Sequence, residues 1–501
     1  MKKYLFTAFF ILTAAFFAFI NNFSVFAMGD MGFFGGISDG RKLPRTSELL
    51  LAQTARSNQR NQKQTHNYTE LVFIDGRPIE FNGLIDITIN GGVTASMGNF
   101  TVNYRIYPFN SRAAAEDGIS INRTANFRVT YRTEGGQVIY NYDIVKSNWR
   151  DVIVIGDTSY MLDSRRSHYG ISIIEDRTPG VKYYRGDLSS QLYYTYGTNT
   201  EVNIETVGAF YGCHNAWSST ETHRMDVSVV RDGWALAYQI RPSVTVNKVL
   251  QYVQNEPTAI SFSGNYREVM QNNSGLRYDL IHVPQFMWDE PIAGNVNLQS
   301  VNIFEQLPAA DLSFLAGNSA EDDIAKLFAM QILGGVPSDY QPSQLLTRGQ
   351  FVTMLAKAIK LPVEQPAATR TAAQVAYIFS DVNSTRPEYP FILAAFKSGM
   401  ASGRDNGMFY FDYPIERQEA FVMIIKALGL SNLSPNPTPH TPFADDAQIA
   451  SWAKRETSVA LSIGLIAPDE FGHIYPSRHI SKGEAATLIN HVIEYLRAGL
   501  V

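Results

Sequence analysis

Three basic residues, Arg348, Arg417 and Lys482, occupy the same position in a motif that recurs near the end of the chain. The three copies read Leu-Thr-Arg-Gly-Gln, Ile-Glu-Arg-Gln-Glu and Ile-Ser-Lys-Gly-Glu, at residues 346–350, 415–419 and 480–484. Each copy precedes apolar residues at helical spacing, so each predicts the start of a helix. The helix macrodipole disfavours a cation in the first turn by about 0.3–1 kcal/mol. The presence of a cation in the first turn of all three predicted helices therefore needs an explanation.

A basic side chain beside unpaired N–H groups at a helix start can bind an anion. This is the function that we expect for the three cations. The alternative is that each cation pairs with a carboxylate of a neighbouring copy and acts as a strut between repeats. For one copy the sequence leaves both roles open, and the threefold recurrence favours ligand binding.

Two copies carry a predicted capping box, in which a hydroxyl and the side chain three residues later bond each other's backbone N–H. These pairs are Thr347 with Gln350 and Ser481 with Glu484. Glu416 replaces the hydroxyl in the middle copy. A predicted helix and a glycine-containing loop precede each motif, and we expect those glycines to supply the positive φ that ends a helix. They are Gly334, Gly335, Gly399, Gly403 and Gly464.

Copies two and three also begin alike, with Phe-Ser-Asp at 379–381 and Phe-Ala-Asp at 443–445. Together these features resemble the S-layer homology (SLH) domain. Its pattern is an opening Phe-x-Asp, a helix, a glycine-rich loop and an Ile-Thr-Arg-Ala-Glu-like motif, usually in three tandem copies. The likeness covers about residues 305–498, and we place the repeats at 305–363, 379–430 and 443–498.

The resemblance implies a three-pronged helical bundle that binds acidic secondary cell-wall polysaccharide, often through a negatively charged pyruvyl ketal. By position it gives the binding role to Arg348, Arg417 and Lys482. Gly335, Gly403 and Gly464 would then line the grooves. Copy one lacks a clear Phe-x-Asp opening, and copy three has a lysine, which cannot form the bidentate fork of arginine. We therefore expect the three grooves to be unequal.

Composition limits the classes of function. The chain has 501 residues, 45% of them hydrophobic, which is enough for several packed domains. A net charge of −5 gives no basic surface for nucleic acid. Cys213 is the single cysteine, so an intrachain disulfide is excluded. No cofactor is expected.

The first 27 residues read as a secretory signal peptide, with Lys2 and Lys3, an apolar core, and a cleavage site after Ala27. The alternative is an uncleaved N-terminal anchor. After cleavage we expect no membrane partner and a location in the cell wall or S-layer of a Gram-positive bacterium. Residues 28–66 read as a flexible lead-in.

From about Tyr68 to Val253 apolar and polar side chains alternate, as in β-strands, and we place a β-rich domain at residues 67–300. Asp75-Gly76, Gly135-Gly136 and Asp232-Gly233 predict hairpin turns. The predicted fold class is therefore multidomain: an all-β antiparallel sandwich or barrel-like domain, followed by an α-helical bundle of three repeats. From Pro257 to Gln306 the alternation weakens, and this part either closes the β domain or leads into the helices.

The β-rich region shows no clear catalytic signature. Cys213, His214 and His223 have metal-ligand residue types but no dependable ligand spacing, and a loop with a partly buried cysteine and surface histidines explains them better. Adjacent Asp289 and Glu290 beside Trp288 could serve a sugar site, but neighbours on a strand point to opposite faces. We expect no metal site.

We therefore expect a surface protein that the repeats anchor to the cell wall, with lattice neighbours as further partners. It would display the β-rich domain for structural or binding purposes. The main alternative is a wall-tethered glycan or peptidoglycan hydrolase with its site in residues 67–300. A third is an outer-membrane barrel with a wall-binding arm, although such arms follow the signal peptide and this one is C-terminal.

Overall fold

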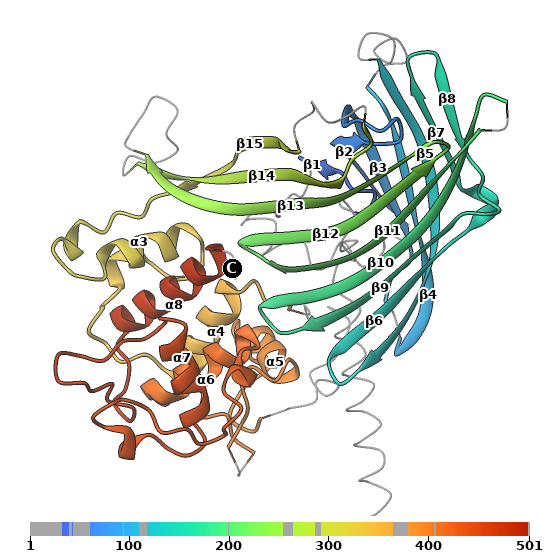
Figure 1. The fold of residues 1–501 in the computed structure, drawn as a ribbon. Coiled ribbons are helices and arrows are strands. Elements are labelled where there is room, and N and C mark those ends of the chain that lie inside the picture. Colours follow the sequence, from blue (N-terminus) through green and yellow to red (C-terminus); the bar gives the residue numbers. More distant parts are fainter. Residues whose placement is uncertain are drawn as a thin grey trace, which may run out of the picture.

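The computed structural model describes residues 33–39, 43, 61–93, 95–109, 118–198, 200–253, 264–285, 292–363, 379–404 and 407–498. An antiparallel β-sheet is followed by a group of helices (Figure 1), so the predicted order of a β-rich part and a helical part is confirmed. The predicted signal peptide, most of the predicted lead-in and the Trp288–Glu290 cluster lie outside the described residues.

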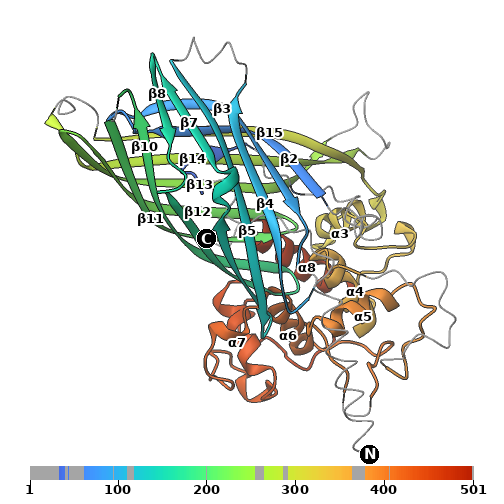
Figure 2. The same cartoon turned by 90° about the vertical axis from the view of Figure 1, so that its right-hand side faces the viewer.

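In the part of the chain that the structure describes, fifteen strands form one sheet, in which most sequence neighbours pair antiparallel. They are β1 (Ile37–Ser38), β2 (Asn61–Val72), β3 (Ile79–Asn90), β4 (Met97–Pro108), β5 (Ile119–Glu134), β6 (Gln137–Ile144), β7 (Arg150–Ile155), β8 (Thr158–Leu162), β9 (His168–Arg177), β10 (Val181–Tyr196), β11 (Thr200–Asn215), β12 (Ser218–Arg231), β13 (Trp234–Val253), β14 (Asn265–His282) and β15 (Ala293–Pro308). The hairpin β7–β8 leaves this order and pairs with β5 and β10. Figure 2 shows how strongly the sheet curves.

All three predicted hairpins are confirmed. β2 pairs with β3 across Asp75-Gly76, β5 with β6 across Gly135-Gly136, and β12 with β13 across Asp232-Gly233. Gly76 and Gly233 both have φ of 87°, which only glycine adopts readily. At these three hairpins the turn residues thus set the register of the paired strands, as the sequence predicted.

The concave face of the sheet holds an aromatic core that includes a segment from the predicted lead-in. Phe33 is buried among Tyr104, Tyr142 and Phe210, with ring centroids 6.3, 5.9 and 5.4 Å away. The Tyr169 hydroxyl donates to the Phe33 carbonyl. The β-rich part therefore includes residues before the predicted boundary at 67, and its described strands run from Ile37 in β1 to Pro308 in β15.

β1 links β2, near the first margin of the curved sheet, to β14, the strand next to the last. Its backbone pairs with β2, matching Ile37 with Thr69. On its other side the Ser274 hydroxyl of β14 donates to the Ser38 carbonyl at 2.7 Å, and Asn272 donates to the Asp39 carbonyl. This arrangement holds β2 and β14 near each other, while β15 lies beyond β14 as the last strand.

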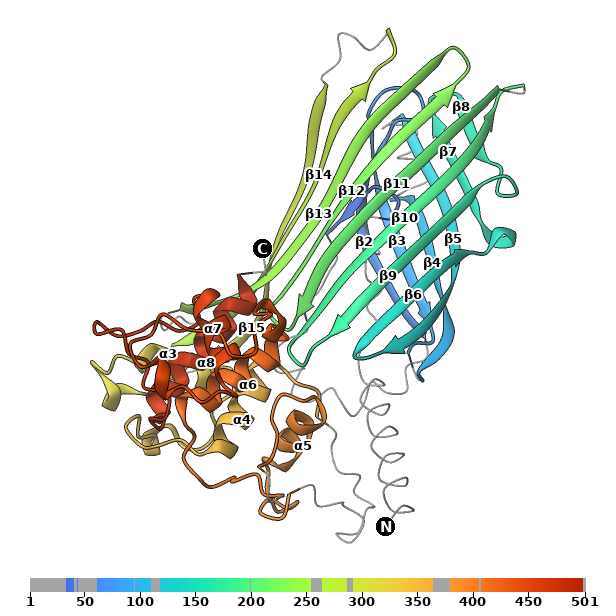
Figure 3. The same ribbon diagram turned by 60° about the horizontal axis from the view of Figure 1, so that its bottom comes forward.

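Among the described residues, six α-helices follow the sheet and gather at one end of its strands (Figures 1 and 3). They are α3 (Glu321–Ala329), α4 (Arg348–Ala358), α5 (Tyr389–Lys397), α6 (Arg417–Leu428), α7 (Lys454–Ser462) and α8 (Lys482–Arg497). α4, α6 and α8 begin at Arg348, Arg417 and Lys482, so the three predicted helix starts are confirmed. Within the described ranges, no helix combines the length and apolar composition needed to cross a membrane.

The sheet and the helices share one hydrophobic core. Val181, Trp217 and Leu307 from the strands are buried in the same cluster as the helix residues Phe351, Ile425 and Ile493. The Trp217 indole N–H donates to the carbonyl of Ala358, at the end of α4, at 2.7 Å. The Tyr183 hydroxyl donates to the Leu428 carbonyl, at the end of α6, at 3.1 Å. The β-rich part is thus fixed to the helices by packing as well as by chain connection.

Candidate functional site

The residues before the three recurring helices meet in a ring of three backbone hydrogen bonds. Leu346 N–H donates to the Ile480 carbonyl at 2.9 Å, Ile480 N–H to the Ile415 carbonyl at 3.0 Å, and Ile415 N–H to the Leu346 carbonyl at 3.1 Å. These apolar residues are buried. The ring places the three motifs side by side although 134 positions separate the first from the last, 480 minus 346.

The first N–H groups of each helix are already bonded. In α4, the N–H of Arg348 donates to Tyr413 and that of Gly349 to Phe411, at 2.8 and 3.0 Å. The first two N–H groups of α6 and of α8 donate in the same way to carbonyls of a neighbouring copy, at 2.8–2.9 Å. In α4 and α8 the third N–H group, that of Gln350 or Glu484, donates to the capping hydroxyl of Thr347 or Ser481. The expectation of unpaired N–H groups is therefore wrong, and any anion here must be held by side chains.

Arg348 lies between the first and second copies. Its guanidinium forms an ion pair with Glu419 at 2.8 Å and donates to the Ser402 carbonyl at 2.9 Å. It also lies over the Phe409 ring, and the residue is only 6% exposed. Burial lowers the pKa of this guanidinium, although Glu419 acts in the opposite sense. These contacts match the strut role that the sequence left open.

Arg417 repeats this relationship between the second and third copies, with more exposure. Its Nε donates to the Ile474 carbonyl at 2.7 Å, and its Nη1 lies 3.5 Å from Glu484. Glu484 also binds Arg478. Burial by itself would raise the pKa of Glu484, but the Ser481 N–H and the two arginines outweigh it and lower the pKa. The Arg417 side chain is 20% exposed and lines a groove.

Lys482 differs from both arginines. Its ammonium group donates to Gln344 at 2.5 Å and lies over the Tyr340 ring. The carboxylate that the other copies provide is replaced here, since Gln350 stands where copies two and three have Glu419 and Glu484. The three cations are therefore held unequally.

The three predicted groove glycines also differ. Gly335 and Gly464 have φ of 94° and 70°, in the left-handed region expected after a helix. Gly403 is not among the positive-φ glycines, and a Cβ there would lie 2.5 Å from the Phe379 ring. Its role as a helix-ending glycine is thus wrong, and close packing explains it instead. None of the three lines the groove beside Arg417.

The groove beside Arg417, called the Arg417 groove below, has a volume of about 460 Å³. This lies within the roughly 300–1,000 Å³ of ligand sites. Phe421, Leu465 and Ile466 supply apolar surface, while Asn318, Ser481 and His491 supply polar groups. An arginine, hydroxyls and apolar surface together suit an acidic sugar, because the cation pairs with the carboxylate and the apolar surface faces the ring.

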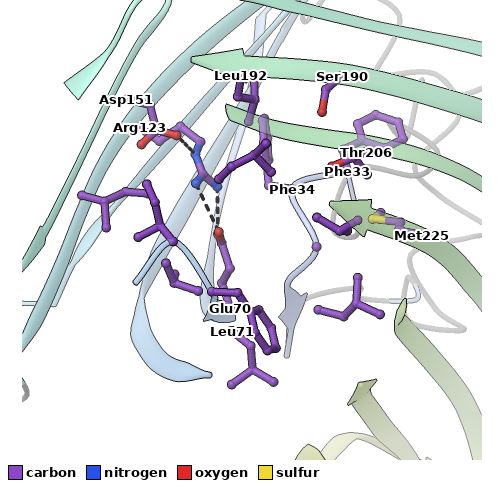
Figure 4. A pocket seen from close by; sticks show the side chains of 18 of the residues that line it. Phe33, Phe34, Glu70, Leu71, Arg123, Asp151, Ser190, Leu192, Thr206 and Met225 are labelled. Atoms are coloured by element: carbon purple, nitrogen blue, oxygen red, sulfur yellow. Dashed lines mark hydrogen bonds and ion pairs between the residues drawn. The ribbon is translucent and has the colours of Figure 1, made fainter. Parts of the chain in front are cut away.

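A second cavity lies inside the curved sheet (Figure 4). Arg123 there forms ion pairs with Glu70 at 2.8 Å and Asp151 at 2.6 Å. Burial raises the pKa of Glu70, with Arg123 opposing the shift. The cavity measures about 90 Å³, which is below the roughly 300–1,000 Å³ of ligand sites. Both carboxylates thus form ion pairs with the same buried arginine.

The predicted loop around Cys213, His214 and His223 is wrong. Cys213 and His214 lie on β11 and His223 on β12, where Cys213 and His223 are buried. His223 bonds Glu221 at 2.6 Å and stacks on the Phe210 ring. Among the described side chains no cluster has a metal-binding arrangement.

The chain shows likeness to known proteins in part of its length. A family model for the S-layer homology domain matches residues 316–352 and 378–421. An S-layer protein of Bacillus thuringiensis subsp. finitimus is 26% identical over 158 residues, 32% of this chain and 18% of the relative. Exoglucanase XynX of Acetivibrio thermocellus is 28% identical over 179 residues, covering 35% of this chain and 16% of the relative.

An endoglucanase of Bacillus sp. (strain KSM-635) is 24% identical over 172 residues, 34% of this chain and 17% of the relative. The chain thus covers less than a fifth of the length of these relatives. The matched residues include Arg348 and Arg417 with the first turns of their helices, and the ring of hydrogen bonds joins these motifs to the third copy. The chain therefore contains an S-layer homology domain in its C-terminal helical part.

Proposed function

We propose that the protein is a secreted surface protein of a Gram-positive bacterium. Three S-layer homology repeats, packed as one helical bundle, would hold it to acidic, pyruvylated secondary cell-wall polysaccharide. The Arg417 groove carries this proposal, because it combines a partly exposed guanidinium, hydroxyls and apolar surface between two motifs. The β-rich part would be displayed outside the wall as a structural or binding domain, with lattice neighbours as further partners.

Within this proposal the three basic residues contribute in order of their access to ligand. Arg417 lines the groove and is expected to contact the sugar carboxylate directly. Lys482 is partly exposed at the start of α8 and would contribute less. Arg348 is 6% exposed, so it would act mainly by fixing the second motif through Glu419.

Sedimentation of the mature full-length chain with purified cell walls tests the proposal. Arg417→Ala should weaken binding about tenfold or more, since a charge-assisted hydrogen bond is worth about 1.5–3 kcal/mol. Salt should weaken the wild-type interaction. Arg185→Ala is the matched control, because Arg185 is 72% exposed on the sheet, far along the chain from the groove. Full binding by a folded Arg417→Ala variant would contradict the groove assignment, as would equal binding to walls from which the pyruvyl groups have been removed.

The alternative function, a wall-tethered glycan or peptidoglycan hydrolase, draws on the likeness to two glucanases. That likeness covers less than a fifth of each enzyme. The carboxylates Glu70 and Asp151 are the pair that the alternative would use, and both are bound to Arg123. Release of soluble sugars from walls by the wild type, lost in Glu70→Gln, would establish this alternative instead.

A further inference from the structure

The last strand of the sheet, β15, offers a long free edge. It pairs with β14 from Asn265–Pro308 to Asp279–Ala293, and no other strand among the described residues pairs with its outer side. In Figure 1 it runs along the margin of the sheet, beyond β14. The part from Ala293 to Asn302 spans about 33 Å at the usual rise of a strand. Free N–H and C=O groups along such an edge can pair with another strand.

The edge lacks the features that usually prevent such pairing. Charged side chains and prolines protect natural edge strands, yet the sequence Ala-Gly-Asn-Val-Asn-Leu-Gln-Ser-Val-Asn-Ile-Phe has neither before Glu305. β14, the neighbour of β15, carries Arg267, Glu268, Arg277 and Asp279. Val301 is 68% exposed and Ile292, just before the strand, is 72% exposed. The free edge is therefore both uncharged and partly apolar.

The two faces of β15 differ in a regular way. Asn295, Asn297 and Gln299 are exposed, and they alternate with Val296 and Leu298, which are half-buried against the core of the sheet. A strand added at the edge would cover the remaining surface of Val296 and Leu298. It would also need neutral polar residues on its outer face.

We propose that β15 pairs antiparallel with β15 of a second copy of this chain, so that two sheets join into one across a twofold axis. In such a pair each strand meets its own sequence in reverse, and any charge near the centre would face the same charge. The neutral stretch from Ala293 to Asn302 avoids that repulsion. Because polar and apolar residues alternate along β15, the pairing places the apolar face of one copy beside the apolar face of the other. A second copy therefore provides a matching strand, and no specialised partner is needed. The inference does not depend on the Arg417 groove.

Sedimentation velocity of the mature full-length chain over a concentration series tests the pairing. The wild type should form a dimer that persists in high salt, because the edge carries no charge. The double variant Asn297→Lys, Gln299→Lys should dimerise about tenfold more weakly or not at all, since like charges then meet across the axis. The variant Asn297→Glu, Gln299→Glu should behave the same way.

A mixture of the Lys and Glu variants identifies the partner as a second copy, because opposite charges should restore the dimer only between unlike chains. The matched control is Ser189→Lys, Gln191→Lys, which adds the same charge to exposed positions of β10, a strand paired on both sides. Far-UV circular dichroism and wall sedimentation should be unchanged in all variants. A monomeric wild type, a Lys variant that still dimerises, or a mixture that stays monomeric would overturn the inference.

Discussion

Arg348 of the first motif forms an ion pair at 2.8 Å with Glu419, the residue that caps the helix of the second motif. Arg417 stands in the same relation to Glu484 of the third motif, at 3.5 Å. The cation that opens one helix thus faces the capping carboxylate of the next. This geometry explains how a cation is tolerated in the first turn, since the nearby carboxylate offsets the unfavourable macrodipole.

Replacing Arg348 by alanine is expected to lower the free energy of unfolding by about 3 kcal/mol, because it leaves Glu419 buried with less compensation. Denaturant unfolding of the full chain measures this. Arg404 also bonds Glu419, at 2.9 Å, but its side chain is 52% exposed. Arg404→Ala should therefore cost less than about 1 kcal/mol. Equal losses in the two variants would show that the buried Arg348–Glu419 ion pair stabilises the fold no more than the exposed Arg404–Glu419 pair does.

Inside the sheet, Arg123→Met should be more damaging than any surface substitution. It would leave Glu70 and Asp151, which are 6% and 3% exposed, without their shared cation. We expect a loss of about 3–5 kcal/mol in denaturant unfolding. Adding Glu70→Gln and Asp151→Asn should recover part of that loss, because the uncompensated charges are then removed. If the triple variant is no more stable than Arg123→Met, the charges are not the cause.

Lys360 lies at the junction of the sheet and the helices, 8% exposed, with its ammonium group 5.4 Å from the centre of the Trp217 ring. Among the described residues its Nζ has no hydrogen-bond partner. Burial, with Lys248 and Lys357 as further causes and Glu268 and Glu305 opposing, lowers its pKa from 10.5 to about 7. Because the folded pKa is below the unfolded one, stability should rise with pH between about 7 and 10.5.

Lys360→Met should remove that rise. It should also stabilise the protein at pH 7 by roughly 2–4 kcal/mol, since one pKa unit corresponds to about 1.4 kcal/mol. Unfolding curves at pH 7 and pH 10 measure both effects. Lys426→Met, an exposed position near the end of α6, is the matched control and should change neither. A loss of stability at pH 7 in Lys360→Met would contradict the burial argument.

The hydrogen bonds of Asp446 predict how the stability of the protein changes in acid. Burial would raise its pKa, but hydrogen bonds from Lys454 at 2.7 Å and Thr441 at 2.6 Å lower it from 3.8 to about 2. Since the folded pKa is depressed, the ionised carboxylate stabilises the fold above pH 4, and this contribution is lost as the pH falls towards 2. Asp446→Asn should therefore melt below the wild type at pH 5, with the gap shrinking by pH 2. Asp232→Asn, in an exposed turn, should show no such convergence.

The sequence predicted the helix starts well because their signals are local. Capping residues, apolar spacing and turn glycines lie within a few positions of one another. It favoured a ligand site over a strut, because Glu419 lies 71 positions from Arg348 and only the fold brings the two residues together. The bonded N–H groups at the helix starts were unpredictable for the same reason, because their acceptors belong to other copies.

The weak alternation between Pro257 and Gln306 has a different cause. β14, which lies in this part, buries Glu268, Asn272 and Ser274, so its inward positions do not read as apolar. The Asn272 and Ser274 side chains bond the backbone around β1, and Lys248 pairs with Glu268 at 3.1 Å. Polar residues satisfied by distant partners thus hid the alternation on which the prediction relied. Phe33 was read as part of a flexible segment because nothing nearby in the sequence shows the aromatic pocket that holds it.

The bond from the Trp217 indole to the end of α4 has a mechanical consequence. A sheet joined to the helices only by a flexible linker could rotate relative to them when fluid flows past the cell. Here the buried contact between strands and helices restricts that rotation. A load applied to the strands would pass directly to the helices that carry the Arg417 groove. The sheet should therefore keep a constant orientation relative to whatever those helices bind.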